Sequence, residues 1–159
     1  MAGTPRAAQA VIGGITLVPN TRWVDQMARN LVDAVSGFLN GKTHLIHDRD
    51  PLFTAKFRDI LKSAGVETAR LPARSPNLNA FAERFVLSIK SECLDRMVFI
   101  GERRLRRAIE EYVEHYHLER PHQGLGNTLI HGVPESPNGA VQRRERLGGM
   151  LSSYYCEAA

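Results

Sequence analysis

The chain has 159 residues, of which 43% are hydrophobic, enough for one ordinary domain and too many for a disordered tail. Its net charge of +4 fits either a soluble protein kept from its isoelectric point or a protein that binds a polyanion. Its two cysteines, Cys93 and Cys156, form neither a disulfide framework nor a zinc pair, which favours a reducing compartment. No apolar stretch is long enough to span a bilayer, and no signal peptide is evident, so a cytoplasmic protein without a membrane partner is expected.

Strands and helices are predicted in alternation along the chain. A β-branched run at residues 10–18 predicts a strand, and apolar positions at helical spacing predict a helix over residues 24–35, capped by Asn20 or Thr21. The further predicted elements are a strand at residues 44–47, a helix at 57–64 ended by Gly65, a strand at 66–70, a loop at 71–79, and two long helices at about 78–93 and 105–116.

This alternation predicts an α/β fold with helices packed on a small, mostly parallel sheet. Three strands are few for such a sheet, which suggests that strands are missing. Residues 128–159 are rich in Gly, Pro and Ser and carry a basic run from Arg143 to Arg146. We expect them to be a poorly ordered tail with one short helix at most.

Two stretches contain candidate functional residues. The apolar run at residues 44–47 places Asp48 at the carboxyl end of a strand, the edge where α/β sheets bind ligands. Alternatively, Asp48 and Asp50 only form a turn before Pro51. In the second stretch, a helix of 3.6 residues per turn places Asn79, Glu83 and Lys90 in one stripe, opposite Phe81, Phe85 and Ile89. That stripe is also what the solvated face of any amphipathic helix looks like.

Together the two stretches resemble the catalytic domain of DDE recombinases, the ribonuclease H-like class of insertion-sequence transposases and retroviral integrases. In that family a strand-end aspartate precedes an aromatic residue by five positions, as Asp48 precedes Phe53. The family's catalytic glutamate follows about 35 positions later in a long helix, after a Pro-Asn-x-Asn-Ala segment. Glu83 stands 35 positions after Asp48, and residues 76–80 match that segment.

A third stretch resembles the insertion-sequence branch of the family. Its members carry a Tyr-x-x-x-Arg-Pro-His-x-x-Leu pattern downstream, and the run at residues 92–95 also looks like theirs. We call the matching residues the Arg-Pro-His motif; they are Tyr116, Arg120, Pro121, His122 and Leu125. The resemblance covers about half of the chain with several stretches in the right order.

The resemblance implies a partial ribonuclease H-like integrase core over residues 1–127, followed by the tail at 128–159. Family members cleave and join DNA with two divalent ions, Mg²⁺ or Mn²⁺, held by three acids. Asp48 and Glu83 match the second and third acids, as catalytic residues and metal ligands. Asp50 stays open as an alternative to Asp48, because many relatives carry Gly there. The residues expected to contact DNA are Arg74, Asn79, Arg84 and Lys90.

The first acid of the family has no counterpart. Only Asp25 and Asp33 precede Asp48, and both fall in the predicted helix at 24–35. We therefore expect an N-terminally truncated domain that is inactive alone, binds DNA near the nucleoid, and forms oligomers or aggregates through the sheet edge beside residues 10–18. Two alternatives remain: an enzyme completed by another chain, and a non-catalytic DNA-binding or assembly module.

Overall fold

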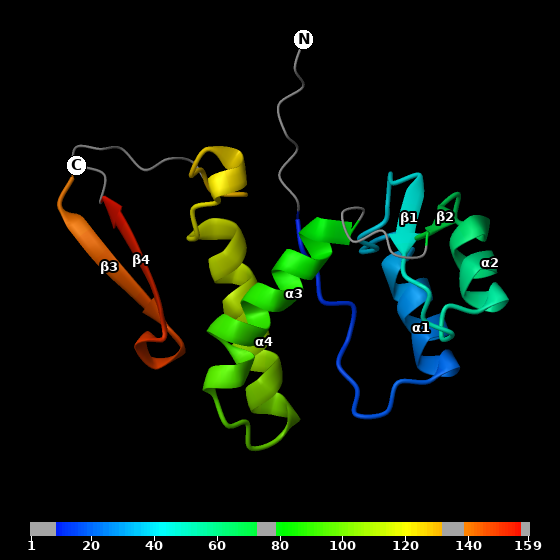
Figure 1. Ribbon diagram of the computed structural model, residues 1–159, viewed down its shortest axis with the longest axis horizontal. Coiled ribbons are helices and arrows are strands. Elements are labelled where there is room, and N and C mark those ends of the chain that lie inside the picture. Colours follow the sequence, from blue (N-terminus) through cyan, green and yellow to red (C-terminus); the bar gives the residue numbers. More distant parts are fainter. Residues whose placement is uncertain (1–8, 73–78, 132–138, 157–159) are drawn as a thin grey trace, which may run out of the picture. The chain divides into compact units, whose positions relative to one another are not determined.

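The computed structural model describes residues 9–72, 79–131 and 139–156 (Figure 1). These residues form α-helices and short strands in mixed order, which confirms the α/β class. The elements are α1 (Thr21–Leu31), β1 (His44–His47), α2 (Ala55–Ser63), β2 (Glu67–Arg70), α3 (Ala80–Glu92), α4 (Glu102–Leu118), β3 (Val141–Arg146) and β4 (Leu151–Cys156). Among the described helices, none is long and apolar enough to cross a membrane.

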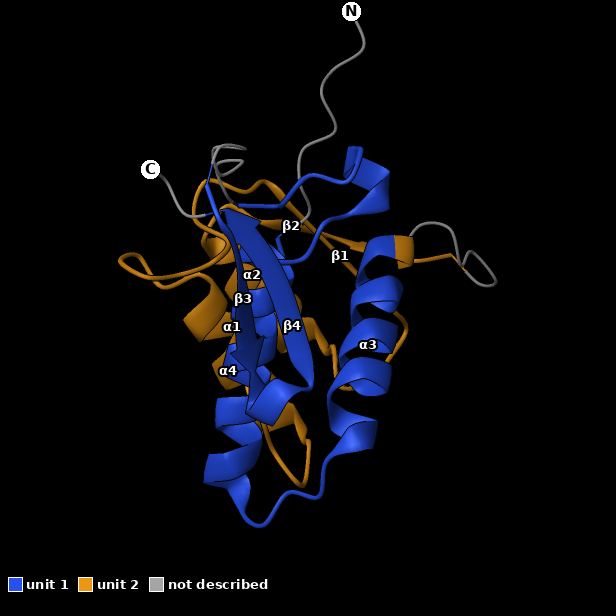
Figure 2. Cartoon of the chain, turned by 90° about the vertical axis from the view of Figure 1, so that its left-hand side faces the viewer, with its two compact units in different colours: residues 1–10, 81–159 blue, residues 11–80 orange. Residues whose placement is uncertain are grey.

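The chain divides into two compact units, which Figure 2 shows in different colours. We call residues 11–80 the first unit; they are orange (unit 2) in Figure 2 and hold α1, β1, α2 and β2. We call residues 81–159, together with the start of the chain up to residue 10, the second unit; they are blue (unit 1) in Figure 2 and hold α3, α4, β3 and β4. We predicted a core at residues 1–127 and a tail at residues 128–159. That prediction concerns which residues belong to the family's domain, so the division into compact units does not test it and it stays a prediction.

Local signals define the helices of the first unit. The Asn20 side chain accepts a hydrogen bond from the Trp23 amide at 3.0 Å, so the predicted cap is confirmed at Asn20. After α2, Gly65 adopts a φ of +81°, and the amide of Val66 donates to the Leu61 carbonyl at 3.0 Å. That bond is typical of a Schellman motif, and it confirms Gly65 as the end of the helix.

A parallel strand pair carries the first candidate acid. β1 pairs with β2 in parallel, with His44 opposite Glu67 and His47 opposite Arg70. α1 and α2 pack against each other, and Val24, Phe57 and Leu61 lie in the buried core of the unit. Because α2 connects two parallel strands, Asp48 leaves β1 at the carboxyl end of the pair, as predicted.

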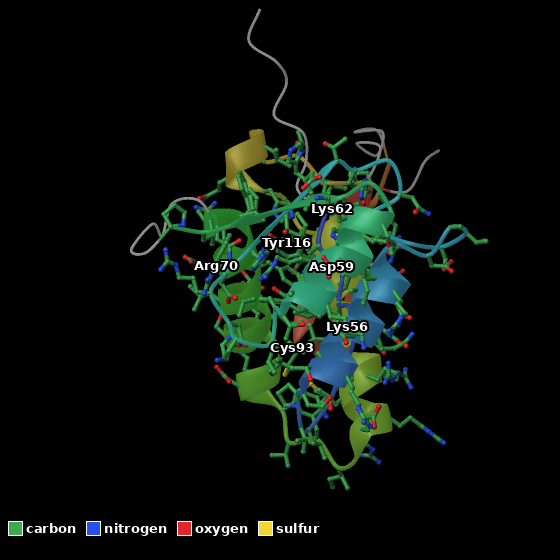
Figure 3. All side chains as sticks on the ribbon, turned by 90° about the vertical axis from the view of Figure 1, so that its right-hand side faces the viewer. Lys56, Asp59, Lys62, Arg70, Cys93 and Tyr116 are labelled. Carbon is green, nitrogen blue, oxygen red and sulfur yellow. The ribbon has the colours of Figure 1, made fainter. Side chains whose placement is uncertain are left out.

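One face of α2 is charged. Lys56, Asp59 and Lys62 follow one another along that helix at intervals of three residues (Figure 3). The Lys56 ammonium lies 3.1 Å from the buried carboxylate of Asp25 on α1. Asp25 therefore has a structural partner between the two helices, in agreement with its predicted place on a helix.

The predicted strand at residues 10–18 is wrong. In the described part of the chain these residues form no regular structure, and the sheet of the first unit contains β1 and β2 alone. Leu17 is 99% exposed and Val18 71% exposed, so the end of this β-branched run contributes little to a core. Strand propensity requires a neighbouring strand with which to pair, and none is available here. The predicted sheet edge beside residues 10–18 is therefore also wrong.

In the second unit, aromatic rings join α3 to α4. Phe85 of α3 meets Tyr116 of α4 edge to face, with ring centroids 5.0 Å apart. Phe85 and Ile89 are buried, as their spacing predicted, and Cys93 just beyond α3 is fully buried. Phe81 does not follow this pattern, because 77% of its surface is exposed.

The C-terminal region is more ordered than predicted. β3 and β4 form an antiparallel hairpin, with Val141 opposite Cys156 and Arg146 opposite Leu151. Its turn places Leu147, Gly148 and Gly149 at positive φ, and the glycines adopt that conformation without steric cost. The Glu111 carboxylate accepts a hydrogen bond from the Leu147 amide at 3.2 Å, which holds the one strained residue of the turn. The expectation of a poorly ordered region is therefore wrong for residues 141–156.

A buried carboxylate attaches this hairpin to α4. The Glu119 side chain is 4% exposed and lies 2.7 Å from the Arg146 guanidinium and 3.0 Å from His115 Nδ1. Burial raises the pKa of Glu119, but the hydrogen bonds from Arg146 and His115 outweigh it and hold that pKa at about 2. The stabilisation is complete above its usual pKa of 4.5 and is lost as pH falls toward 2.

We expect Arg146→Met to destabilise the second unit by about 3 kcal/mol, because it leaves the buried Glu119 without its main partner. Arg143→Met is the matched control, since the Arg143–Glu145 pair is about half exposed and should contribute under ~1 kcal/mol. The free energy of unfolding, with hydrogen exchange of the β3 and β4 amides, measures both changes. Equal losses in the two variants would show that the network does not hold the hairpin.

Candidate metal and nucleic-acid site

Asp48 lies in a turn directly after β1. Its Oδ1 accepts a hydrogen bond from the Asp50 amide at 3.0 Å, and Asp50 Oδ1 accepts one from the Leu52 amide at 2.8 Å. Both aspartates therefore form the turn, as the structural alternative predicted. Both side chains are also exposed, and no described residue bonds to the second oxygen of either carboxylate. The turn thus uses half of each carboxylate and leaves the other half for a ligand.

A buried histidine supports this turn. His47 Nδ1 donates a hydrogen bond to the Asp48 carbonyl at 2.7 Å. The His47 ring lies 5.0 Å from the Phe53 ring and 6.1 Å from the Phe57 ring, centroid to centroid. The aromatic residue five positions after Asp48 therefore has a physical role, because it packs on the histidine that orients the Asp48 backbone. From the sequence, Phe53 was recognisable only as part of a family pattern.

Glu83 stands in the first turn of α3 on an exposed face. Arg84 and Lys90 are exposed on the same helix, and none of the three has a hydrogen bond or an ion pair among the described residues. Asn79 precedes the helix and is half-buried. A negative charge in the first turn of a helix is favoured by the helix dipole, so the position of Glu83 is a favourable one for an acid. Arg74 lies outside the described residues.

The arginine cluster at the start of α4 is partly neutralised. Arg106 pairs with Glu102 and Arg107 pairs with Glu111, each at 2.7 Å across one helical turn. Arg103 and Arg104 have no such partner in the part of the chain that is described. The cluster therefore offers two free cations and not the four that its sequence suggests.

The Arg-Pro-His motif has a clear structural role. Arg120 makes an ion pair with Glu92 at the end of α3, with a nitrogen–oxygen distance of 2.8 Å. The Tyr112 hydroxyl donates to the same carboxylate at 3.1 Å, and burial raises the pKa of Tyr112, which keeps that proton in place. Glu92 was noted in the sequence only as part of a family run. No local sequence pattern indicated that Glu92 pairs with Arg120.

Comparison with known protein families gives a match for part of the chain. Residues 64–128 match the family model described as an integrase core domain. This segment is therefore similar to an integrase core. The match confirms the resemblance to integrases and transposases that the motifs suggested. No curated protein and no solved structure matches the chain.

The integrase match contains some candidate residues and not others. Glu83, Lys90 and the Arg-Pro-His motif lie inside residues 64–128, whereas Asp48 lies before that segment. Asp48 is in the first compact unit and Glu83 in the second. Within the described residues no group of three or more His, Cys, Asp or Glu side chains is gathered as a metal site. The roles of Asp48 and Glu83 therefore remain predictions.

The donor chemistry of the two acids fits Mg²⁺ or Mn²⁺. Both are exposed carboxylates with a free oxygen, and these ions prefer hard oxygen ligands and keep several of their waters. His47 is not part of such a donor set, because its Nδ1 is used by the Asp48 carbonyl and its Nε2 is buried. A single exposed carboxylate of this kind suits a weakly held ion.

We expect Asp48 to bind Mn²⁺ weakly through the carboxylate oxygen that the turn does not use. Titration of the labelled protein with Mn²⁺ should broaden the amide signals around Asp48. Asp48→Asn should shift the midpoint of that broadening to higher concentration, because the amide is a weaker ligand than the carboxylate. Asp95→Asn, which removes an exposed acid elsewhere, is the control. Equal midpoints in Asp48→Asn and in the unchanged protein would contradict a metal ligand at this position.

Proposed function

We propose that this chain is part of a DNA transposition or integration protein with a ribonuclease H-like core. The match of residues 64–128 to an integrase core domain carries this proposal. The parallel β1–β2 pair with its connecting α2, followed by the acid-bearing α3, agrees with such a core. That the core is partial is a separate proposal. It rests only on the lack of a residue that matches the family's first acid.

In this proposal Asp48 and Glu83 are catalytic residues and ligands of the divalent metal that the family's chemistry uses, the roles that the resemblance assigns to them. The ion, when bound, supplies positive charge to the oxygens between which phosphoryl transfer takes place. The turn from Asp48 to Leu52 fixes one carboxylate, and the first turn of α3 presents the other. Asp50 remains the alternative ligand, because its carboxylate is used by the turn in the same way as that of Asp48.

DNA contacts are proposed for the exposed face of α3. Arg84 and Lys90 are cations without internal partners, so they can meet phosphates without breaking an existing ion pair. Asn79 precedes the same face, and Arg74 is included by its place in the sequence. These residues contact the DNA backbone and therefore position it without selecting a sequence.

Catalysis by this polypeptide alone is not expected. A paired metal site needs an acid that bridges both ions, and the resemblance assigns only two acids among the 159 residues. We propose that the chain binds DNA but does not cut it unaided. A protein acting on chromosomal DNA would work in the cytoplasm at the nucleoid. The outer edges of the two-stranded β1–β2 sheet have no partner among the described strands, which favours self-association.

DNA binding should be weak, mainly electrostatic and without strong sequence preference. If about four cations contact phosphates, the logarithm of the affinity should fall with the logarithm of salt at a slope of roughly −3 to −4. Arg84→Ala and Lys90→Ala should each flatten that slope by about one unit, whereas Lys62→Ala on α2 should not. Fluorescence anisotropy with a duplex oligonucleotide measures the slope. Salt-independent binding would contradict the proposed interface.

The purified chain should not nick supercoiled plasmid DNA with Mg²⁺ or Mn²⁺, because two acids do not build a paired metal site. Gel electrophoresis of the plasmid after incubation measures nicking. Metal-dependent nicking that disappears in Asp48→Asn but persists in Asp50→Asn would overturn this prediction. Such a result would show that Asp48 is a ligand and that a further acid is recruited from another copy or partner.

A further inference from the structure

The Arg-Pro-His motif lines a pocket that the proposed chemistry does not use. The pocket has a volume of about 480 Å³ and lies within the second unit. All five residues of the motif contribute to its wall, and α3 adds Phe81, Arg84 and Ser88. Arg84 directly follows Glu83 in the chain. The residues of the Arg-Pro-His motif therefore line one cavity, and Arg84, the chain neighbour of a candidate catalytic acid, lines the same cavity.

The motif side of the pocket is held firmly by internal contacts. Arg120 is fixed by its ion pair with Glu92 at 2.8 Å. His122 Nε2 donates to the Tyr116 carbonyl at 2.8 Å, and the two rings meet edge to face at 4.6 Å. These polar groups already have partners inside the protein. The wall is thus preformed and supplies shape and aromatic surface but no free charge.

The α3 side of the pocket, in contrast, has unused groups. Phe81 lines the pocket and is still 77% exposed, so its ring lies at the open side. Arg84, three residues later on the same helical face, is exposed and has no ion pair in the described part of the chain. An aromatic ring and a free guanidinium one helical turn apart can receive a flat apolar group and an anion at once.

We propose that this pocket receives one unpaired nucleotide of the DNA bound along α3. The base stacks on Phe81 and its phosphate meets Arg84, the combination by which proteins bind single-stranded nucleic acid. The volume is within the range of small-ligand pockets and accommodates a single nucleotide. A base inside a duplex is already stacked, so the pocket selects DNA ends or unpaired positions. This inference rests on the proposed function and adds the form of DNA that the site prefers.

The test compares three DNA probes by fluorescence anisotropy: a blunt duplex, the same duplex with a three-nucleotide overhang, and the same overhang with its bases removed. The third probe keeps the phosphates, so it separates stacking from charge. The base-bearing overhang should bind roughly 5- to 150-fold more tightly than the abasic one, the ratio that stacking of one base gives.

Variants of the pocket complete the experiment. Phe81→Ala should remove the preference for the base-bearing overhang, and Phe81→Trp should preserve it. Leu87→Ala is the matched control, because Leu87 is a 68% exposed apolar residue of α3 outside the pocket. Arg84→Ala should weaken binding of both overhangs equally, because they share their phosphates.

The outcomes separate this inference from the proposed function. Duplex binding without any preference for the base-bearing overhang, or a preference that survives Phe81→Ala, would overturn the pocket assignment and leave the proposed function standing. In that case an apolar side chain of a protein partner becomes the better occupant. Failure to bind any of the three probes would defeat the proposed function and the pocket assignment together.

Discussion

The ion pair between Glu92 and Arg120 is the contact on which the surface of the second unit depends. It joins the last turn of α3 to the segment just after α4, 28 residues along the chain. The fully buried Tyr112 adds its hydroxyl to the same carboxylate. Removal of Glu92 would leave the buried Tyr112 hydroxyl and the half-buried Arg120 guanidinium without this acceptor, which costs more than the pair itself contributes. Both the exposed face of α3 and the wall of the nucleotide pocket are therefore set by one carboxylate.

Elements with local signals could be predicted from the sequence. α1 and α2 follow from apolar spacing, with the Asn20 cap and the Gly65 terminator in place, and β1 falls at the predicted residues. The run at residues 10–18 gave the wrong prediction because β-branched residues form a strand only beside a partner. The β3–β4 hairpin was missed for the opposite reason. Arg146 of the hairpin finds its partners at Glu114 and Glu119, 32 and 27 residues earlier in the chain, and no local sequence pattern indicates such pairs.

The candidate site shows the same limit. The sequence offered two interpretations of Asp48, a turn former and a metal ligand, as though one excluded the other. The structure has Asp48 Oδ1 in the turn and leaves Oδ2 without a described partner, so the two roles are compatible. The turn role is observed, and the ligand role stays a prediction. Phe81 was assigned to the buried face by spacing alone, but the first turn of a helix can extend beyond the core that its later turns cover.

Composition overstates the surface available to DNA. The chain carries 21 Lys and Arg residues, yet many of its arginines already bind carboxylates: Arg106, Arg107, Arg120, Arg144 and Arg146 all have such partners. The basic run from Arg143 to Arg146 therefore attaches a hairpin and is not a DNA-binding tail. Arg84 and Lys90 are among the cations left without partners, and both follow Glu83 on α3. Free positive charge thus lies on the helix that carries the candidate acid, where a phosphate backbone would have to run if Glu83 holds a metal ion.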